Sequence, residues 1–219
     1  MSLIVFGHPF SSYTQKVLIA LYENKIPFEF RLIEPDQQEN SAEWLRRWPL
    51  RKFPLLVDED TQVAETSIII EYLGLMYPGP VPLLPADPQA ALPVRFMDRF
   101  FDLHVMNAMQ YAVDGALGIN GVSAAPGRAT AEEKLIRAYG WLEEALSGHD
   151  WAVGNDFTMA DCAAAPSLFY ADWVLQIGPD YPQLAAYRAR LLARPSVARA
   201  VEGGRPYRHY FPLGAPNRD

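Results

Sequence analysis

Six prolines lie within residues 78–93 and divide the sequence into two parts of different character. A proline has no backbone N–H to donate and its ring clashes with the preceding helical turn, so a run this dense cannot stay helical. Prolines at this density predict a stiff, extended connector. We therefore expect a first domain over residues 1–77, a linker over 78–93 and a second domain over 94–219.

The first part alternates between strand-like and helix-like patterns. Residues 3–6 are continuously apolar and residues 28–33 alternate apolar with polar side chains, which is typical of strands. Residues 11–23 and 41–48 place apolar side chains on one helical face, the second with Ser41 as its N-cap. Strands that alternate with helices and end in a hairpin predict an α/β unit with a crossover connection.

The hairpin and a further helix are expected within residues 54–76. An acidic turn separates the apolar run 55–57 from a second short strand at 61–63. Helical spacing then begins beside Thr66, a residue whose hydroxyl group can cap a helix.

This stretch has the features of a binding site for an anionic, peptide-like ligand. If the bond before Pro54 is cis, the backbone of Phe53 is free to hold an extended ligand. The N-terminus of the following helix attracts anions, and the carboxylate of Glu65 suits an ammonium group. The alternative is an ordinary edge strand followed by an ordinary helix cap, and the pattern alone leaves both interpretations open.

Beyond the linker the pattern is helical almost throughout, and we expect an all-helical second domain. Thr130 precedes Glu133, and Thr158 precedes Asp161, at the spacing of a capping box, which predicts that helices start at these two threonines. The tail, residues 205–219, mixes aromatic side chains with prolines. It either folds back as a cover or extends freely.

Charge and composition exclude several classes of protein. The net charge is −7 and no run of basic residues is longer than two, so we expect no nucleic-acid partner. Neither the single cysteine, Cys162, nor the four histidines have metal-ligand spacing, and we expect no metal. No apolar stretch approaches the ~20 residues of a membrane span, so we expect no membrane partner. A single cysteine fits a reducing compartment such as the cytoplasm.

Two serines at the start of the first helix can act on a bound anion. The hydroxyl groups of Ser11 and Ser12 can donate to an anion there, and the positive end of the helix dipole adds to the attraction. A thiolate bound at this point is stabilised, which lowers the pKa of the thiol. The alternative is that both serines only cap the helix.

Three separated motifs resemble those of the glutathione S-transferase family. Residues 52–55 and 65–73 resemble the glutathione-binding half of that family, with Thr66 where the family most often has serine. Ser11 and the apolar segment after it resemble the serine-type members, and residues 157–161 match the folding element of the helical domain. The resemblance spans nearly the whole chain and implies a thioredoxin-like N-terminal domain followed by an all-helical C-terminal domain.

The resemblance also implies a function. It implies a cytoplasmic, homodimeric detoxification enzyme that conjugates the thiolate of glutathione, its co-substrate, to a small apolar electrophile. The implied catalytic residue is Ser11, with Ser12 as the alternative. The implied glutathione-binding residues are Lys52, Phe53, Pro54, Glu65 and Thr66. The residues expected to line the electrophile pocket are Phe10, Tyr13, Met106, Met109 and Tyr111.

Two other functions fit the same resemblance. One is a glutathione-dependent isomerase of the maleylacetoacetate type, although that branch prefers a cysteine where this chain has Tyr13. The other is a non-catalytic binding protein that has kept the fold. Because residues 11–14 contain no cysteine, a mechanism that uses a protein thiol in this loop is disfavoured.

Overall fold

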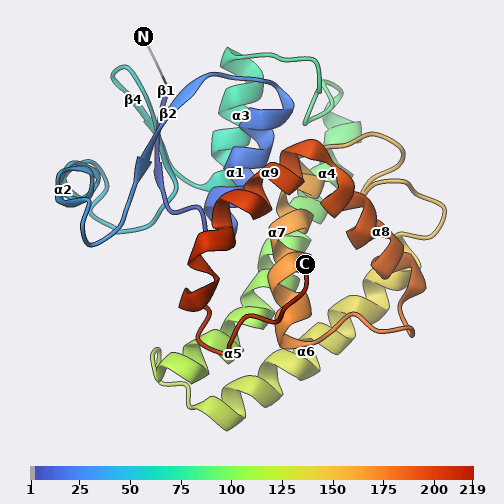
Figure 1. Cartoon of the computed structure of the whole chain (residues 1–219). Coiled ribbons are helices and arrows are strands. Elements are labelled where there is room, and N and C mark those ends of the chain that lie inside the picture. Colours follow the sequence, from blue (N-terminus) through green and yellow to red (C-terminus); the bar gives the residue numbers. More distant parts are fainter. Residues whose placement is uncertain (1–2) are drawn as a thin grey trace.

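The computed structural model describes residues 3–219, so residues 1–2 of the first expected domain lie outside the described part. A small sheet with its helices is followed by a larger helical assembly (Figure 1). The first part consists of β1 (Leu3–Gly7), α1 (Ser12–Glu23), β2 (Phe28–Leu32), α2 (Gln38–Arg47), β3 (Leu55–Asp58), β4 (Thr61–Val63) and α3 (Thr66–Met76). The second part consists of α4 (Pro88–Phe100), the π-helical segment η1 (Phe101–Met106), α5 (Asn107–Leu117), α6 (Ala124–Ala145), α7 (Met159–Val174), α8 (Pro182–Ala193), α9 (Pro195–Gly204) and the 3-10 segment η2 (Arg205–Tyr210). This order confirms the predicted fold class, a thioredoxin-like domain followed by an all-helical one.

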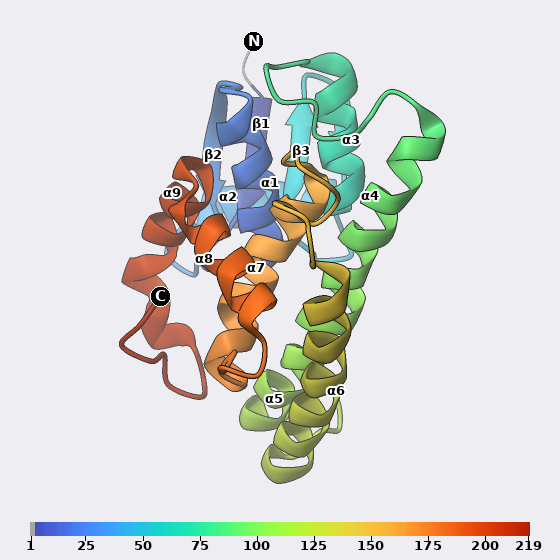
Figure 2. The ribbon, with the colours of Figure 1, turned by 90° about the vertical axis from the view of Figure 1, so that its right-hand side faces the viewer.

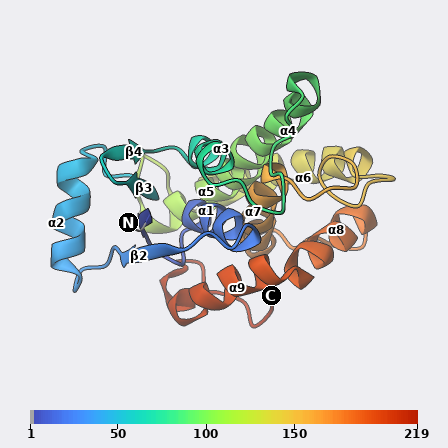
Figure 3. The ribbon, with the colours of Figure 1, turned by 90° about the horizontal axis from the view of Figure 1, so that it is seen from above.

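The sheet has the strand order β2-β1-β3-β4, in which only β1 and β2 run parallel. The helix α1 provides the crossover between these two strands, and α2 lies on the opposite side of the sheet from α1 and α3 (Figure 3). Phe6 near the end of β1 pairs with Leu55 at the start of β3. The loop that follows β1 therefore begins beside Pro54, which directly precedes β3.

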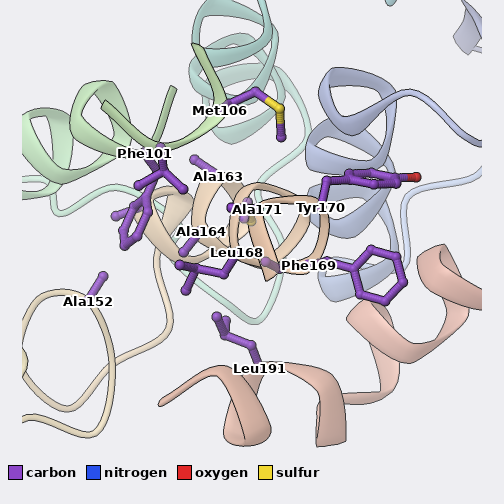
Figure 4. Close-up of a cluster of buried hydrophobic side chains, with 14 of the residues drawn as sticks. Phe101, Met106, Ala152, Ala163, Ala164, Leu168, Phe169, Tyr170, Ala171 and Leu191 are labelled. Carbon is purple, nitrogen blue, oxygen red and sulfur yellow. The ribbon is translucent and has the colours of Figure 1, made fainter. Parts of the chain in front are cut away.

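The helix α7 forms the centre of the second part. Every residue of α7 is buried, and the helix lies between α6 on one side and α8 and α9 on the other (Figure 2). Figure 4 shows side chains of α7, among them Leu168 and Phe169, packed with Phe101 and Leu191 from neighbouring segments. The alanines along this helix leave room for the surrounding helices to approach closely.

The predicted capping box at the start of α7 is confirmed. The N–H and the hydroxyl group of Thr158 donate to the same carboxylate oxygen of Asp161, at 2.8 and 3.1 Å. The other oxygen of Asp161 accepts from the Tyr187 hydroxyl at 2.6 Å and from the Ala152 N–H at 2.8 Å. Burial raises the pKa of Asp161, but these four donors stabilise its charged form.

The expectation that residues 78–93 stay extended is wrong for their last part. The helix α4 begins at Pro88, where the missing N–H needs no helical partner, and Pro93 lies inside it. The Asp87 carboxylate accepts from the N–H groups of Gln89 and Ala90 at 3.4 and 3.0 Å and so caps the helix. The division of the chain into two domains remains our proposal.

Two predicted caps are also wrong. The helix α6 begins at Ala124 rather than at Thr130, and it contains Gly127. A Cβ atom on Gly127 would lie 2.5 Å from the Tyr111 carbonyl oxygen, so this glycine permits close packing of α5 and α6 and does not break the helix. Ser41 lies inside α2, which begins at Gln38. The N-cap of α3 is Glu65, and Thr66 is the first helical residue.

The C-terminal tail folds back onto the helical part. Phe211 is buried, and its ring packs against those of Tyr170 and Trp173, with centroids 6.5 and 5.1 Å apart. The guanidinium group of Arg218 donates to the carboxylate and the carbonyl oxygen of Asp172 on α7, at 3.1 and 2.8 Å. Of the two arrangements left open by the sequence, the structure therefore has the folded-back one.

Candidate functional site

Two cavities adjoin the N-terminal ends of α1 and α3. The larger, which we call the α3 pocket, has a volume of about 740 Å³ and is lined by Tyr13, Trp48, Leu50, Lys52, Phe53, Pro54, Ala64, Glu65, Thr66, Ser67, Ile68, Arg99, Asp102, Leu103 and Asn107. The smaller, which we call the tail pocket, has a volume of about 290 Å³ and is lined by Phe10, Ser11, Ser12, Tyr13, Met109, Gln110, Val113, Leu117, Tyr170, Tyr210, Phe211 and Pro212. Tyr13 lines both.

The α3 pocket brings together all five residues expected to bind glutathione: Lys52, Phe53, Pro54, Glu65 and Thr66. The peptide bond between Phe53 and Pro54 is cis. Glu65 has a φ of 67°, a left-handed conformation that is uncommon for a residue other than glycine. This conformation turns the chain from β4 into α3, and the Glu65 carbonyl oxygen accepts the first helical bond, from the Ile69 N–H at 2.8 Å.

The start of α3 can attract a negatively charged ligand. Within residues 3–219, no side chain caps this helix at its N-cap position. Its first N–H groups are therefore left to water or to a ligand, and the positive end of the helix dipole favours an anion there.

A buried ion cluster lies beneath the α3 pocket. The Lys16 ammonium nitrogen lies 2.7 Å from a carboxylate oxygen of Asp98 and 2.9 Å from one of Asp102, and it donates to the Ser67 hydroxyl at 3.1 Å. Lys16 is only 1 % exposed and Asp98 is completely buried. Burial raises the pKa of Asp102, while Lys16 and the Arg99 guanidinium 3.3 Å away favour its charged form. The cluster joins α1, α3, α4 and η1, and so fixes the start of α3 beside the pocket.

Sequence reasoning missed this cluster, although one signal was available. Asp98 and Asp102 are four residues apart and therefore share a helical face, which otherwise carries apolar side chains such as Val94 and Phe101. Two acidic residues on a buried face predict a buried cation nearby. The identity of that cation, Lys16 on a helix of the first domain, required the tertiary structure.

Tyr13 lies between the two pockets. Its hydroxyl group donates to the Asn107 side-chain oxygen at 3.3 Å. Burial, together with the negative charge of Asp102, raises the pKa of Tyr13 to about 12. At neutral pH this side chain is therefore a neutral phenol that can donate a hydrogen bond but cannot act as a base.

The tail pocket brings together part of the expected electrophile pocket. Phe10, Tyr13 and Met109 line it, but Met106 and Tyr111 do not. Met106 is 2 % exposed and belongs to the hydrophobic core, and Tyr111 is 39 % exposed, with the Lys134 ammonium 5.3 Å from its ring centroid.

Helical spacing explains the position of Tyr111. Met109 and Val113 are four residues apart on α5 and share the face that lines the tail pocket, so Tyr111, midway between them, points away. The folded-back tail contributes Tyr210, Phe211 and Pro212 to the opposite wall. Only the folded structure places these three residues in the pocket.

Both predicted catalytic serines line the tail pocket, at the start of α1. Ser11 is the N-cap, and its side-chain oxygen accepts from the Thr14 N–H at 3.3 Å. Because this bond uses Ser11 as an acceptor, the hydroxyl hydrogen can still be donated to a ligand. Ser12 is the first helical residue and also adjoins a small void beside Lys16 and Asp102.

The loop that carries Ser11 is held in place by the helical domain. The Tyr170 hydroxyl, on α7, donates to the Phe10 carbonyl oxygen at 2.7 Å. The Gln15 side-chain amide donates to the Pro9 carbonyl oxygen at 2.9 Å and to the Tyr170 hydroxyl at 3.1 Å. These bonds attach the loop directly to the wall of the tail pocket, since Tyr170 also lines that pocket.

Among residues 3–219, no helix is long and apolar enough to cross a membrane. The same part of the chain contains no group of three or more His, Cys, Asp or Glu side chains that could hold a metal ion.

Comparison with known proteins assigns both parts of the chain to one family. Residues 5–81 match the model of the glutathione S-transferase N-terminal domain, and residues 96–195 match that of its C-terminal domain. A probable maleylacetoacetate isomerase of Vibrio cholerae is 28 % identical, over 94 % of this chain and 98 % of the relative. Glutathione transferase GST 23 of Zea mays is 30 % identical, over 79 % of this chain and 78 % of the relative. A glutathione S-transferase of Methylobacterium radiotolerans, solved in complex with glutathione sulfonate, superposes with a TM-score of 0.76 at 30 % identity, over 92 % of this chain and 95 % of that one. With this fold and these matches to both domains, the chain belongs to the glutathione S-transferase family.

Proposed function

We propose that this protein binds glutathione in the α3 pocket and transfers its thiolate to a small apolar electrophile held in the tail pocket. The observation that carries this proposal is that Tyr13, beside the start of α1, lines both cavities. A tripeptide that fills the larger cavity and points its central side chain toward Tyr13 presents its thiol to the smaller cavity.

The chemistry of the α3 pocket suits glutathione. Glutathione is a tripeptide with a carboxylate at each end, an amino group and a thiol. In our proposal the start of α3, with the Thr66 hydroxyl and N–H, holds the γ-glutamyl carboxylate, and Glu65 holds the amino group. The Phe53 backbone holds the central cysteinyl residue, and the Lys52 ammonium meets the glycyl carboxylate.

We assign Ser11 the role of stabilising the thiolate. A hydroxyl that donates to sulfur at a helix N-terminus favours the charged form, which lowers the pKa of the bound thiol and raises the share of the attacking species. The thiolate attacks the electrophilic atom and forms a C–S bond. In a substitution the leaving group departs with the electron pair of its broken bond, and in an addition the displaced pair takes up a proton from water. Ser12, on the next position of the same helix, is the alternative donor.

Ultraviolet difference titration of bound glutathione tests this assignment. We expect wild type to show thiolate absorbance near neutral pH, and Ser11→Ala to bind glutathione but to require a higher pH for the same absorbance. Ser123→Ala is a matched control, because Ser123 is exposed at the N-cap of α6 and makes no side-chain cap bond within the described residues. An unchanged titration in Ser11→Ala together with a shifted one in Ser12→Ala transfers the role to Ser12. If wild type binds no glutathione, the transferase proposal is wrong and a non-catalytic role takes its place.

The 28 % identity to a probable maleylacetoacetate isomerase supports a second candidate, glutathione-dependent isomerisation. Maleylacetoacetate is an anion with carboxylate groups, and a site for it needs cationic side chains. The lining of the tail pocket, as described, contains no lysine, arginine or histidine. This favours an uncharged electrophile. Parallel assays with 1-chloro-2,4-dinitrobenzene and with maleylacetoacetate distinguish the two, and a turnover found only with the second substrate would reverse our choice.

We further propose that the protein acts as a cytoplasmic homodimer in detoxification. Exposed apolar side chains on two consecutive helices, α3 and α4, support a partner surface: Ile68, Leu75, Met76, Leu92 and Phe96 are 55–80 % exposed. Light scattering after size-exclusion chromatography gives the mass in solution. A mass of 24.6 kDa at micromolar concentration would contradict a dimer.

A further inference from the structure

A third cavity lies on the opposite side of α1 from the α3 pocket, between β2 and α9. It has a volume of about 760 Å³ and shares no lining residue with the α3 pocket or the tail pocket. Its lining residues come mainly from β2, α1 and α9 and the segments beside them, and Figures 2 and 3 show these three elements side by side. We call this cavity the β2 groove. Neither glutathione nor the electrophile of the proposed reaction is assigned to it.

The floor of the β2 groove is apolar. Leu18, Leu21 and Ile26 form part of it and are all less than 10 % exposed. Phe28 and Phe30, two residues apart on β2, point to the same face of the sheet and extend this surface. A groove of this size with an apolar floor can bury an alkyl chain or an aromatic ring system.

The rim of the β2 groove carries two cationic side chains, Lys25 and Arg199, both exposed. Within residues 3–219, neither has a carboxylate oxygen within 4.0 Å, whereas the neighbouring Arg194 and Arg205 are both paired with carboxylates. The Arg199 guanidinium instead lies 4.0 Å from the Tyr22 ring centroid, which holds it over the groove. Two cations free of carboxylates at one rim are notable in a chain of net charge −7.

A neutral hydrogen-bond donor lies at the same rim. Tyr22 lines the groove beneath Arg199, and burial raises its pKa, so the phenol stays protonated. Through Lys25, Arg199 and Tyr22 the rim therefore offers positive charge together with N–H and O–H donors. That combination suits a carboxylate head group.

We propose that the β2 groove is a binding site for an amphipathic carboxylate of the fatty-acid class, whose chain lies on the apolar floor and whose carboxylate meets Lys25 and Arg199. Burial of the chain supplies most of the affinity, since surface ion pairs contribute little individually. The charged rim selects anions over neutral or cationic molecules with the same chain.

Calorimetric titration with dodecanoate, below its micelle concentration, tests the proposal. Gly203 lies on α9, lines the groove and has no atom within 4 Å of the position of an added Cβ atom. The Cβ atom of Gly203→Phe therefore meets no neighbour, and the substitution adds a phenyl ring at the wall of the groove. Gly140→Phe is the matched control, because Gly140 on α6 has equally open surroundings and lies outside the groove.

We expect one saturable dodecanoate site in wild type and in Gly140→Phe, and loss of that site in Gly203→Phe. The double substitution Lys25→Glu and Arg199→Glu should weaken dodecanoate binding roughly tenfold, as expected for two surface charges, while dodecanol binding stays unchanged. Full dodecanoate binding in Gly203→Phe would place the ligand elsewhere and overturn the proposal, as would equal binding of dodecanoate by wild type and the double variant.

Glutathione titrations of the same variants separate this proposal from the proposed function. Unchanged glutathione binding in Gly203→Phe shows that the variant is folded and that loss of dodecanoate binding is local. A protein that binds no glutathione but binds dodecanoate in the β2 groove would contradict the transferase proposal and support this one. A protein that binds glutathione but no dodecanoate would support the transferase proposal and contradict this one.

Discussion

Replacement of Lys16 by methionine tests whether the buried ion cluster holds in place the end of α3 that we propose binds glutathione. The substitution removes the ammonium group that lies 2.7 Å from Asp98 and 2.9 Å from Asp102 and leaves two buried carboxylates without it. Removal of one partner from a buried ion pair typically costs 3–5 kcal/mol, because the remaining charge is uncompensated. Arg99 at 3.3 Å still pairs with Asp102, and Ser67 still donates to Asp98, so we expect the lower end, about 3 kcal/mol.

A loss of this size corresponds to a decrease in melting temperature of about 6–12 °C for a chain of this length. Urea denaturation of wild type and Lys16→Met measures the free energy of unfolding directly. Lys25→Met is the control, because Lys25 is exposed and has no carboxylate within 4.0 Å in the described structure. The KM for glutathione should rise together with the loss of stability, because Lys16 also bonds Ser67 at the start of α3.

The pH dependence separates a charge effect from a packing effect. Without Lys16, burial and the negative charge of Asp98 raise the pKa of Asp102 further above its value in the unfolded chain. Such groups reduce stability only where the unfolded carboxyl has lost its proton, so the deficit of the variant should be small near pH ~4 and grow toward neutral pH. A loss below ~1 kcal/mol at neutral pH, or an equal loss at both pH values, would refute the reasoning.

Three further predictions concern single side chains. The tyrosinate absorbance of Tyr13, measured as the difference between wild type and Tyr13→Phe in a pH titration, should appear only near pH 12, because burial and Asp102 raise the pKa of this side chain. A titration midpoint near 10.0 would contradict its buried position. Tyr170→Phe removes the hydrogen bond to the Phe10 carbonyl oxygen; steady-state kinetics should show a kcat decreased roughly tenfold with little change in the KM for glutathione, whereas a change in that KM alone would contradict a role in positioning Ser11. Asp161→Ala leaves several donors at the start of α7 without their acceptor; urea denaturation should show a loss of at least about 3 kcal/mol, and a loss below ~1 kcal/mol would mean that water replaces the carboxylate.

Local patterns predicted those parts of the fold that neighbouring residues control. The capping box of Thr158 and Asp161 and the strand-helix order of the first domain were found because the interacting groups are close in sequence. The predicted starts of α2 and α6 were wrong because contacts between residues far apart in the sequence decide where these helices begin. Both helices begin without a side-chain cap within the described residues, and Gly127 is accommodated through packing against α5. A residue with cap propensity does not mark a helix start when tertiary contacts extend the helix beyond it.

In the candidate site too, the residues that are close in sequence were predicted and those that depend on tertiary packing were not. Lys52, Phe53, Pro54, Glu65 and Thr66 belong to one hairpin and the start of one helix, so a motif read along the chain identified a set that the structure places in one pocket. Met106 and Tyr111 were expected in the electrophile pocket from the family resemblance, which does not state which face of a helix in this chain meets a cavity.

By itself the sequence determined the two-part architecture, the strand and helix order of the first domain and the contiguous motif that we propose binds glutathione, because each depends on residues within a few positions of one another. The tertiary structure decided the rest. The Lys16 cluster joins residues up to 86 positions apart, and the Tyr170 hydroxyl bonds the Phe10 carbonyl oxygen across 160 positions. The tail lines the same pocket as Ser11, near the other end of the chain. The spacing of Asp98 and Asp102 indicates a buried cation, but no periodic signal identifies the partner in a contact over such a separation, because that partner depends on how the completed helices pack against one another.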